Sequence, residues 1–89
     1  MDLDAELRTE LAAFAKAGQH ICAAEVRIRK QQELAEKLGM KGRETRDAER
    51  LVDVLQRTLL QWEVHRRLIE ERISYLETRR TALDDGKGA

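Results

Sequence analysis

Apolar residues recur every seven positions along two long segments of the chain, with charged residues filling most of the positions between them. This spacing is typical of α-helices that pack side by side in a coiled coil. The sequence contains no proline, and glycines interrupt the pattern near its middle. We therefore predict an all-α fold with one helix over about residues 3–38, a loop over 39–45, a second helix over about 46–84 and a flexible tail over 85–89.

Two amphipathic helices joined by a short loop are expected to form an antiparallel, coiled-coil-like hairpin, a single domain over residues 1–89. The seven-residue repeat also predicts its core. The predicted core residues are Leu7, Phe14, Ile21 and Ile28 in the first helix and Leu55, Leu59, Trp62, Ile69, Ile73 and Leu76 in the second. Leu11 flanks this apolar stripe, and Leu83 continues it by one more repeat.

The residues between the two helices carry signals for a helix end and a helix start. Gly39 is predicted to take the left-handed conformation that ends the first helix, and Thr45 to cap the second. A symmetrical loop would place Leu7 beside Arg80 in the finished hairpin. Gly18 lies inside the first helix and costs about 1 kcal/mol relative to alanine, so the first helix is expected to be weakest there.

A second apolar stripe runs along the opposite side of the predicted second helix. Because successive helical residues are about 100° apart, Leu60, Val64, Leu68 and Tyr75 point away from the side that carries Trp62. A lone hairpin would leave this stripe in water, whereas a two-fold dimer would cover it with its own copy. The sequence thus predicts a homodimer that forms a four-helix bundle, with these four residues at the interface.

Charge and composition narrow the range of possible partners. The chain has 17 basic and 17 acidic residues among 89, so it has no overall electrostatic attraction to nucleic acid or to an anionic membrane. Its acidic N-terminus and the lack of a long uncharged apolar run predict neither a signal peptide nor a membrane span. A single cysteine, Cys22, is typical of a reducing compartment, so we expect a cytoplasmic location.

Few residues offer side chains for catalysis or metal binding. The candidates are His20, Cys22, Glu25, Glu63 and His65. Their spacing lacks the Glu-x-x-His motif of bundle proteins that bind di-iron centres, and a helical hairpin offers no concave pocket for a substrate. We therefore expect no enzymatic activity, no cofactor and no metal, and a bundle metal protein is the less favoured alternative.

Basic residues suggest another alternative, a small nucleic-acid-associated regulator. Lys41, Arg43 and Arg46 gather at the predicted loop, and Arg66 with other arginines follows in the second helix. Most basic residues have a carboxylate one turn away, which is usual for a helix face in water. Arg66 also lies near the level of Glu25, where the two residues either form a buried ion pair or line the seam with their aliphatic stems.

Several short motifs between His20 and Ile73 carry a family resemblance. They are Gln19-His20-Ile21, Ala24-Glu25-Val26-Arg27-Ile28, Gln31-Gln32-Glu33-Leu34, Gly42-x-x-Thr45-x-x-Ala48-Glu49-x-Leu51 and His65-Arg66. Together they resemble a group of small, functionally uncharacterised helical-hairpin proteins of alphaproteobacterial type. The resemblance implies a hairpin with Thr45 opening the second helix, and it implies no catalytic residue. The expected function is thus structural, a self-associating hairpin that presents a surface to a macromolecular partner.

Overall fold

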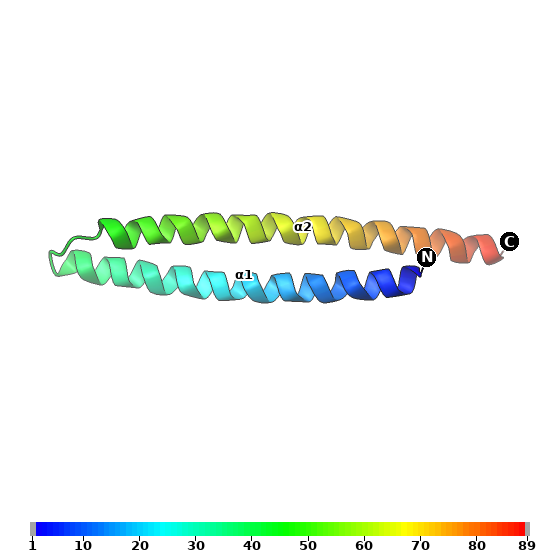
Figure 1. Ribbon diagram of the computed structural model, residues 1–89, viewed down its shortest axis with the longest axis horizontal. Coiled ribbons are helices and arrows are strands. Elements are labelled where there is room, and N and C mark those ends of the chain that lie inside the picture. The colour runs from blue at the N-terminus through cyan, green and yellow to red at the C-terminus, as the bar shows by residue number, and fades with distance from the viewer. Residues whose placement is uncertain (1, 89) are drawn as a thin grey trace.

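The protein folds into two long antiparallel helices, α1 over Leu3–Met40 and α2 over Arg46–Gly88 (Figure 1). A computed structural model describes residues 2–88 and, for side chains, residues 2–84. The helices lie side by side in a rod that measures 73 × 17 × 14 Å. The predicted all-α helical hairpin is therefore confirmed.

The hairpin core lies along the seam between α1 and α2. The ten predicted core residues are all buried or half-buried in the structure. Ala17 and Ala24 are also buried. Leu11 is 46% exposed, so its expected place beside the core is wrong; it lies about 80° away from Ile21 around the helix.

The end of α1 differs from the prediction. Gly42, with φ of 69°, takes the left-handed conformation in place of Gly39. The Arg43 N–H donates to the Leu38 carbonyl at 2.9 Å and the Gly42 N–H donates to the Gly39 carbonyl at 3.0 Å. This pair of hydrogen bonds is a Schellman motif with Gly42 just beyond the helix end. Either glycine could end the helix, and the later one lets α1 add further backbone hydrogen bonds.

The other helix ends use acidic side chains. The Asp2 carboxylate accepts a hydrogen bond from the Ala5 N–H at 3.2 Å and caps α1. Thr45 directly precedes α2, as predicted, but its hydroxyl donates to the Glu49 carboxylate at 3.2 Å, while the Glu44 carboxylate accepts from the first backbone N–H of α2 at 2.8 Å. Negative charge is favourable at these positions because of the helix dipole.

The far end of α2 is longer than predicted. α2 continues through Gly88, so the predicted end near residue 84 and most of the predicted flexible tail are wrong. Glycine weakens a helix but, unlike proline, keeps its backbone N–H, so each added residue still contributes a hydrogen bond. Ala89 lies outside the described residues.

The alignment of the two helices is shifted by about one turn from the symmetrical expectation. Arg80 pairs with Asp4 at 3.3 Å, about one turn before Leu7, and His20 stacks on Trp62. Figure 1 shows the cause: α1 reaches further toward the loop end than α2 does, so the loop runs back along the last turn of α1 before α2 begins. At the other end, α2 extends past the start of α1.

Two glycines of α1 and the loop should respond to alanine in opposite ways. At Gly18, inside the continuous α1, an added Cβ would meet no heavy atom within 4 Å. We therefore expect Gly18→Ala to raise the free energy of unfolding by about 1 kcal/mol. Gly42→Ala should lower it by about 1 kcal/mol because its positive φ disfavours any side chain. Urea unfolding followed by circular dichroism measures both; equal effects of the same sign would contradict the assigned helix end.

Candidate functional site

The strongest candidate for a functional surface is the face of α2 that points away from α1. It carries Leu60, Val64, Leu68 and Tyr75, the four residues predicted to form an interface. In the structure Leu60 is 61% exposed and Leu68 58% exposed, and Val64 and Tyr75 are also exposed. The first three succeed one another at four-residue intervals, so their side chains lie one above the next on one side of the helix. We call this set the outer stripe.

The outer stripe lies opposite the buried side of α2. The six predicted core residues of α2 are buried or half-buried against α1, and at about 100° per residue the middle of the outer stripe lies roughly 160° from the middle of this set around the helix axis. Large apolar side chains at half exposure or more are costly in water when they are contiguous. Within one chain, α1 therefore covers one apolar side of α2, and the outer stripe on the other side is left exposed.

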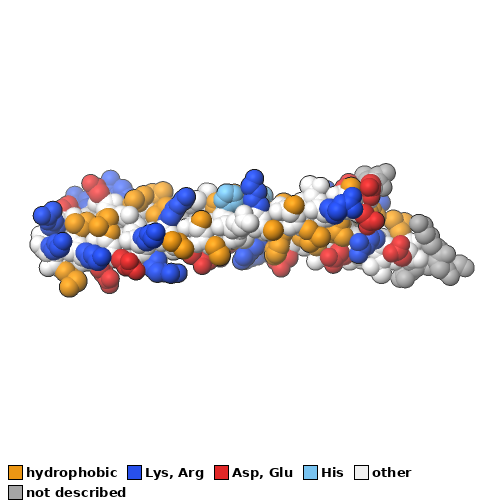
Figure 2. Space-filling model, turned by 90° about the horizontal axis from the view of Figure 1, so that it is seen from below, with side chains coloured by type: hydrophobic (Ala, Val, Ile, Leu, Met, Phe, Trp, Pro, Cys, Tyr) orange, Lys and Arg blue, Asp and Glu red, His pale blue; other side chains and the backbone are white. Residues whose placement is uncertain are grey.

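Charge is mixed over the surface. Figure 2, which views the rod from below Figure 1, shows basic side chains concentrated toward the loop end, with acidic and apolar side chains between them. On this face of the described residues there is no continuous basic strip that could follow a phosphate backbone. The two ion pairs among residues 2–84 are Glu10–Arg72 at 2.9 Å and Asp4–Arg80 at 3.3 Å, and both are partly exposed pairs that contribute about 0–1 kcal/mol.

Of the two arrangements that the sequence allows for Glu25 and Arg66, the ion pair is not formed. Within residues 2–84 the two ion pairs, Glu10–Arg72 and Asp4–Arg80, both lie near the open end of the hairpin. Arg66 is half-buried and Glu25 is exposed. The half-burial of Arg66 fits the arrangement in which its aliphatic stem lines the seam, since a long side chain can cover apolar surface while its charge reaches water.

An aromatic cluster joins the helices near the middle of the rod. The rings of His20 and Trp62 stack with their centroids 4.2 Å apart and their planes 14° apart. His65 also meets Trp62, edge-on, with centroids 5.7 Å apart. The sequence did not indicate that His20 and His65 both contact Trp62. The one-turn shift in alignment, set by the loop, was the missing information.

This cluster does not have the composition of a catalytic or metal site. Within residues 2–84, no three His, Cys, Asp or Glu side chains come together in a way that could hold a metal ion. Cys22 is exposed and, two residues after His20, it points to a different side of α1. Glu63 and Glu25 also lie outside the aromatic stack. The five candidate chemical residues are therefore not assembled into one site.

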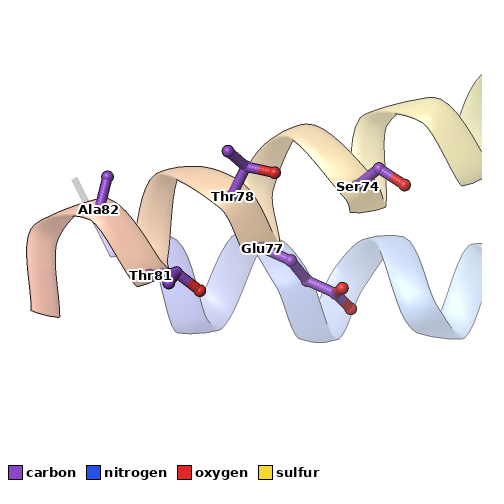
Figure 3. A pocket seen from close by; sticks show the side chains of 5 residues that line it. All are labelled: Ser74, Glu77, Thr78, Thr81 and Ala82. Atoms are coloured by element: carbon purple, nitrogen blue, oxygen red, sulfur yellow. The ribbon is translucent and has the colours of Figure 1, made fainter. Parts of the chain in front are cut away.

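The hollows on the surface are open and shallow. One is lined by Ser74, Glu77, Thr78, Thr81 and Ala82 (Figure 3). All five residues belong to α2, and Figure 3 shows their side chains pointing in different directions from that helix. Such a surface does not surround a small molecule as an enzyme pocket does.

The stack between His20 and Trp62 can be tested as a link between the helices. A double-mutant cycle with His20→Ala and Trp62→Leu should give a coupling free energy of about 0.5–1.5 kcal/mol. The cycle with His65→Ala is the control, because His65 and Trp62 sit on the same helix and such pairs contribute only about 0.2–0.5 kcal/mol. Urea unfolding gives the free energies of unfolding of the wild type, the two single variants and the double variant in each cycle. A larger coupling for His65 would contradict the stacked geometry.

Comparisons with known protein families, with characterised proteins and with solved structures give no significant match to this chain. The resemblance to small alphaproteobacterial proteins therefore stays a prediction. No stretch of either helix within the described residues is both long enough and apolar enough to span a bilayer.

Proposed function

We propose that this chain is a non-enzymatic structural or interaction protein, a helical hairpin that self-associates and presents the rest of its surface to a macromolecular partner. The observation that carries the proposal is the outer stripe of α2, whose four large side chains are exposed in a single chain. Apolar patches of this kind mark interaction sites in proteins of this size. A homodimer is the simplest assembly because one patch then covers its own copy.

Other features support an interaction role over a chemical one. The rod is long and narrow, with extents of 73 × 17 × 14 Å, which gives it a large surface for its mass and little interior. Its open hollows and unassembled chemical residues supply no arrangement for positioning a substrate. We also propose a cytoplasmic location, since the exposed thiol of Cys22 is compatible with a reducing compartment.

Salt dependence separates this proposal from a role in nucleic-acid binding. The sedimentation of the purified chain should be measured at low and high salt, alone and with a fluorescent DNA duplex. We expect self-association that changes little with salt, because it depends mainly on apolar contacts. If the chain instead binds DNA with a logarithm of affinity that falls linearly with the logarithm of salt concentration, and does not self-associate, the nucleic-acid role replaces the one proposed here.

A further inference from the structure

The outer face of α2 carries a symmetrical order of side chains that extends beyond the apolar stripe. Seven exposed residues share a sector about 80° wide and succeed one another at intervals of 4, 3, 4, 4, 3 and 4 positions. They are Asp53, Arg57, Leu60, Val64, Leu68, Glu71 and Tyr75. The intervals read the same in both directions from Val64, as they do about any residue of a helix, so the types of these residues are what distinguish this face. We call these seven residues the symmetrical face.

A face with this order fits an antiparallel copy of itself. If a two-fold axis passes beside Val64, each residue of the face lies opposite the residue at the same distance on the other side of Val64. Leu60 then meets Leu68 of the second copy, and Arg57 meets Glu71 of the second copy. Both contacts occur twice, once on each side of the axis.

We propose that the occupant of this face is a second copy of the chain, laid antiparallel along α2 with the two-fold axis at Val64. The inference rests on the self-association proposed above and adds its geometry. Three apolar positions form the centre of the contact, and an acid opposite a base flanks them at each end. This arrangement of an apolar centre with a polar rim is usual for protein interfaces.

The charges at the rim are available for this pairing. Both ion pairs of residues 2–84 involve other side chains, those of Asp4, Glu10, Arg72 and Arg80. Neither Arg57 nor Glu71 is used in them, and both are exposed. A guanidinium that faces a carboxylate across an interface fixes the register of the two partners more than it adds to their affinity.

Tyr75 extends the complementarity by one more turn. Its hydroxyl oxygen accepts a hydrogen bond from Arg79 Nη1 at 3.4 Å, so its own O–H can still act as a donor. The symmetrical face places this hydroxyl opposite Asp53 of the second copy, whose carboxylate is an acceptor. A tyrosine with an apolar ring and a polar tip suits the edge of such a contact.

Other pairings of the same face are less complementary. A parallel two-fold pairing places Arg57 against Arg57 of the second copy. Moving the antiparallel axis by one turn to Leu68 places Arg57 opposite Arg79, and Leu60 opposite Leu76, which is already buried in the hairpin. Like charges that face each other across an interface disfavour a partner strongly. Of these three pairings, the axis at Val64 is the one that combines apolar contacts with opposite charges.

The proposed contact also determines the shape of the assembly. Residues 53–75 would meet their copy over about 33 Å, at 1.5 Å per residue. Because the symmetrical face lies opposite the side that packs on α1, the four helices would form a single layer in the order α1, α2, α2, α1. A closed four-helix bundle, expected from the sequence, would require the two contacts of α2 to be about a quarter turn apart.

Disulfide crosslinking tests this geometry in the full-length chain. In a Cys22→Ser background, the Val64→Cys variant should crosslink to its own copy under mild oxidation. The Leu60→Cys and Leu68→Cys variants should each crosslink poorly alone, because copies of one residue would lie about 12 Å apart along the axis, beyond the ~7 Å limit for Cα atoms. A mixture of these two variants should crosslink well. Glu70→Cys, on another side of α2, is the control that should not crosslink.

Charge reversal supplies an independent readout. Arg57→Glu should raise the dissociation constant of the dimer by roughly tenfold or more, since it faces Glu71 of the second copy with a like charge. The double variant Arg57→Glu, Glu71→Arg should return the constant to near the wild-type value. Sedimentation equilibrium measures the dissociation constants of the wild type, the single variant and the double variant.

The outcomes separate the geometry from the self-association on which it rests. If the wild type dimerises but Leu60→Cys crosslinks alone as well as Val64→Cys does, or charge reversal is not rescued, the axis at Val64 is wrong and self-association stands. If the wild type is a single chain at every concentration, both proposals fail. Crosslinking at Val64, crosslinking of the mixed variants and rescue by the double variant would together establish the pairing.

Discussion

Leu68→Glu is expected to convert the self-associated hairpin to single chains and to lower its melting temperature. Leu68 is 58% exposed in one chain, so a glutamate there costs the isolated hairpin little. In the dimer it would place two carboxylates, one from each copy, against apolar side chains without a basic partner. Burying such groups should weaken the dimer by at least about a hundredfold. Sedimentation velocity and thermal unfolding at matched concentrations measure both effects.

A matched leucine on the same helix controls for the substitution itself. Leu83 is 54% exposed, close to the exposure of Leu68, but it lies outside the outer stripe and beyond the symmetrical face. Leu83→Glu should therefore leave the dimer intact. An unchanged dimer in the Leu68→Glu variant would show that the outer stripe is not the contact between copies.

Leu76→Ala is expected to cause the largest loss of stability of a single substitution in the hairpin core. Leu76 is 3% exposed and packs where α2 faces the first turns of α1. Removing its side chain should lower the free energy of unfolding by about 2–5 kcal/mol, from lost apolar burial and the cavity that remains. Urea unfolding followed by circular dichroism measures the loss.

Leu83→Ala is again the comparison, because Leu83 occupies the next position of the same seven-residue repeat. The repeat alone predicts equal losses at the two sites. The structure predicts a loss below about 0.5 kcal/mol at Leu83, since α1 begins at Leu3 and Arg80 already contacts Asp4. Equal losses at Leu76 and Leu83 would mean that α1 covers more of α2 than the structure places there.

These two leucines show what periodicity could and could not predict. The seven-residue repeat identified the fold and its ten core residues because helix packing requires one continuous apolar stripe, and Leu76 follows that rule. The repeat says nothing about where the partner helix ends. Leu83 continues the pattern past the start of α1 and is exposed for that reason.

The alignment of the helices was predicted less well because it depends on the path of five loop residues. Gly39 and Gly42 were equally able to end α1, and the choice between them determines how far α1 runs before the chain turns. The choice of Gly42 shifts the alignment by about one turn. As a result, His20 meets Trp62 at a centroid distance of 4.2 Å, a contact that a symmetrical hairpin would not place there.

The candidate surface was predicted in part. Leu60 and Leu68 were identified because an apolar residue on the side away from the partner helix needs an explanation. Arg57 and Glu71 were not identified, since a charged residue in contact with water needs no explanation. Their opposite charges at equal distances from Val64 are present in the sequence, but they gain meaning only once the structure shows that these residues share one exposed face.

The central claim is that α2 needs a covering element on both of its apolar sides, so the folded unit contains more than one chain. The most direct test is the mass of the wild-type protein by sedimentation equilibrium over a wide range of concentrations. We expect a mass of twice the 10.3 kDa of one chain, with dissociation on dilution. A stable, helical and non-aggregating species of 10.3 kDa at the highest concentrations would contradict the claim.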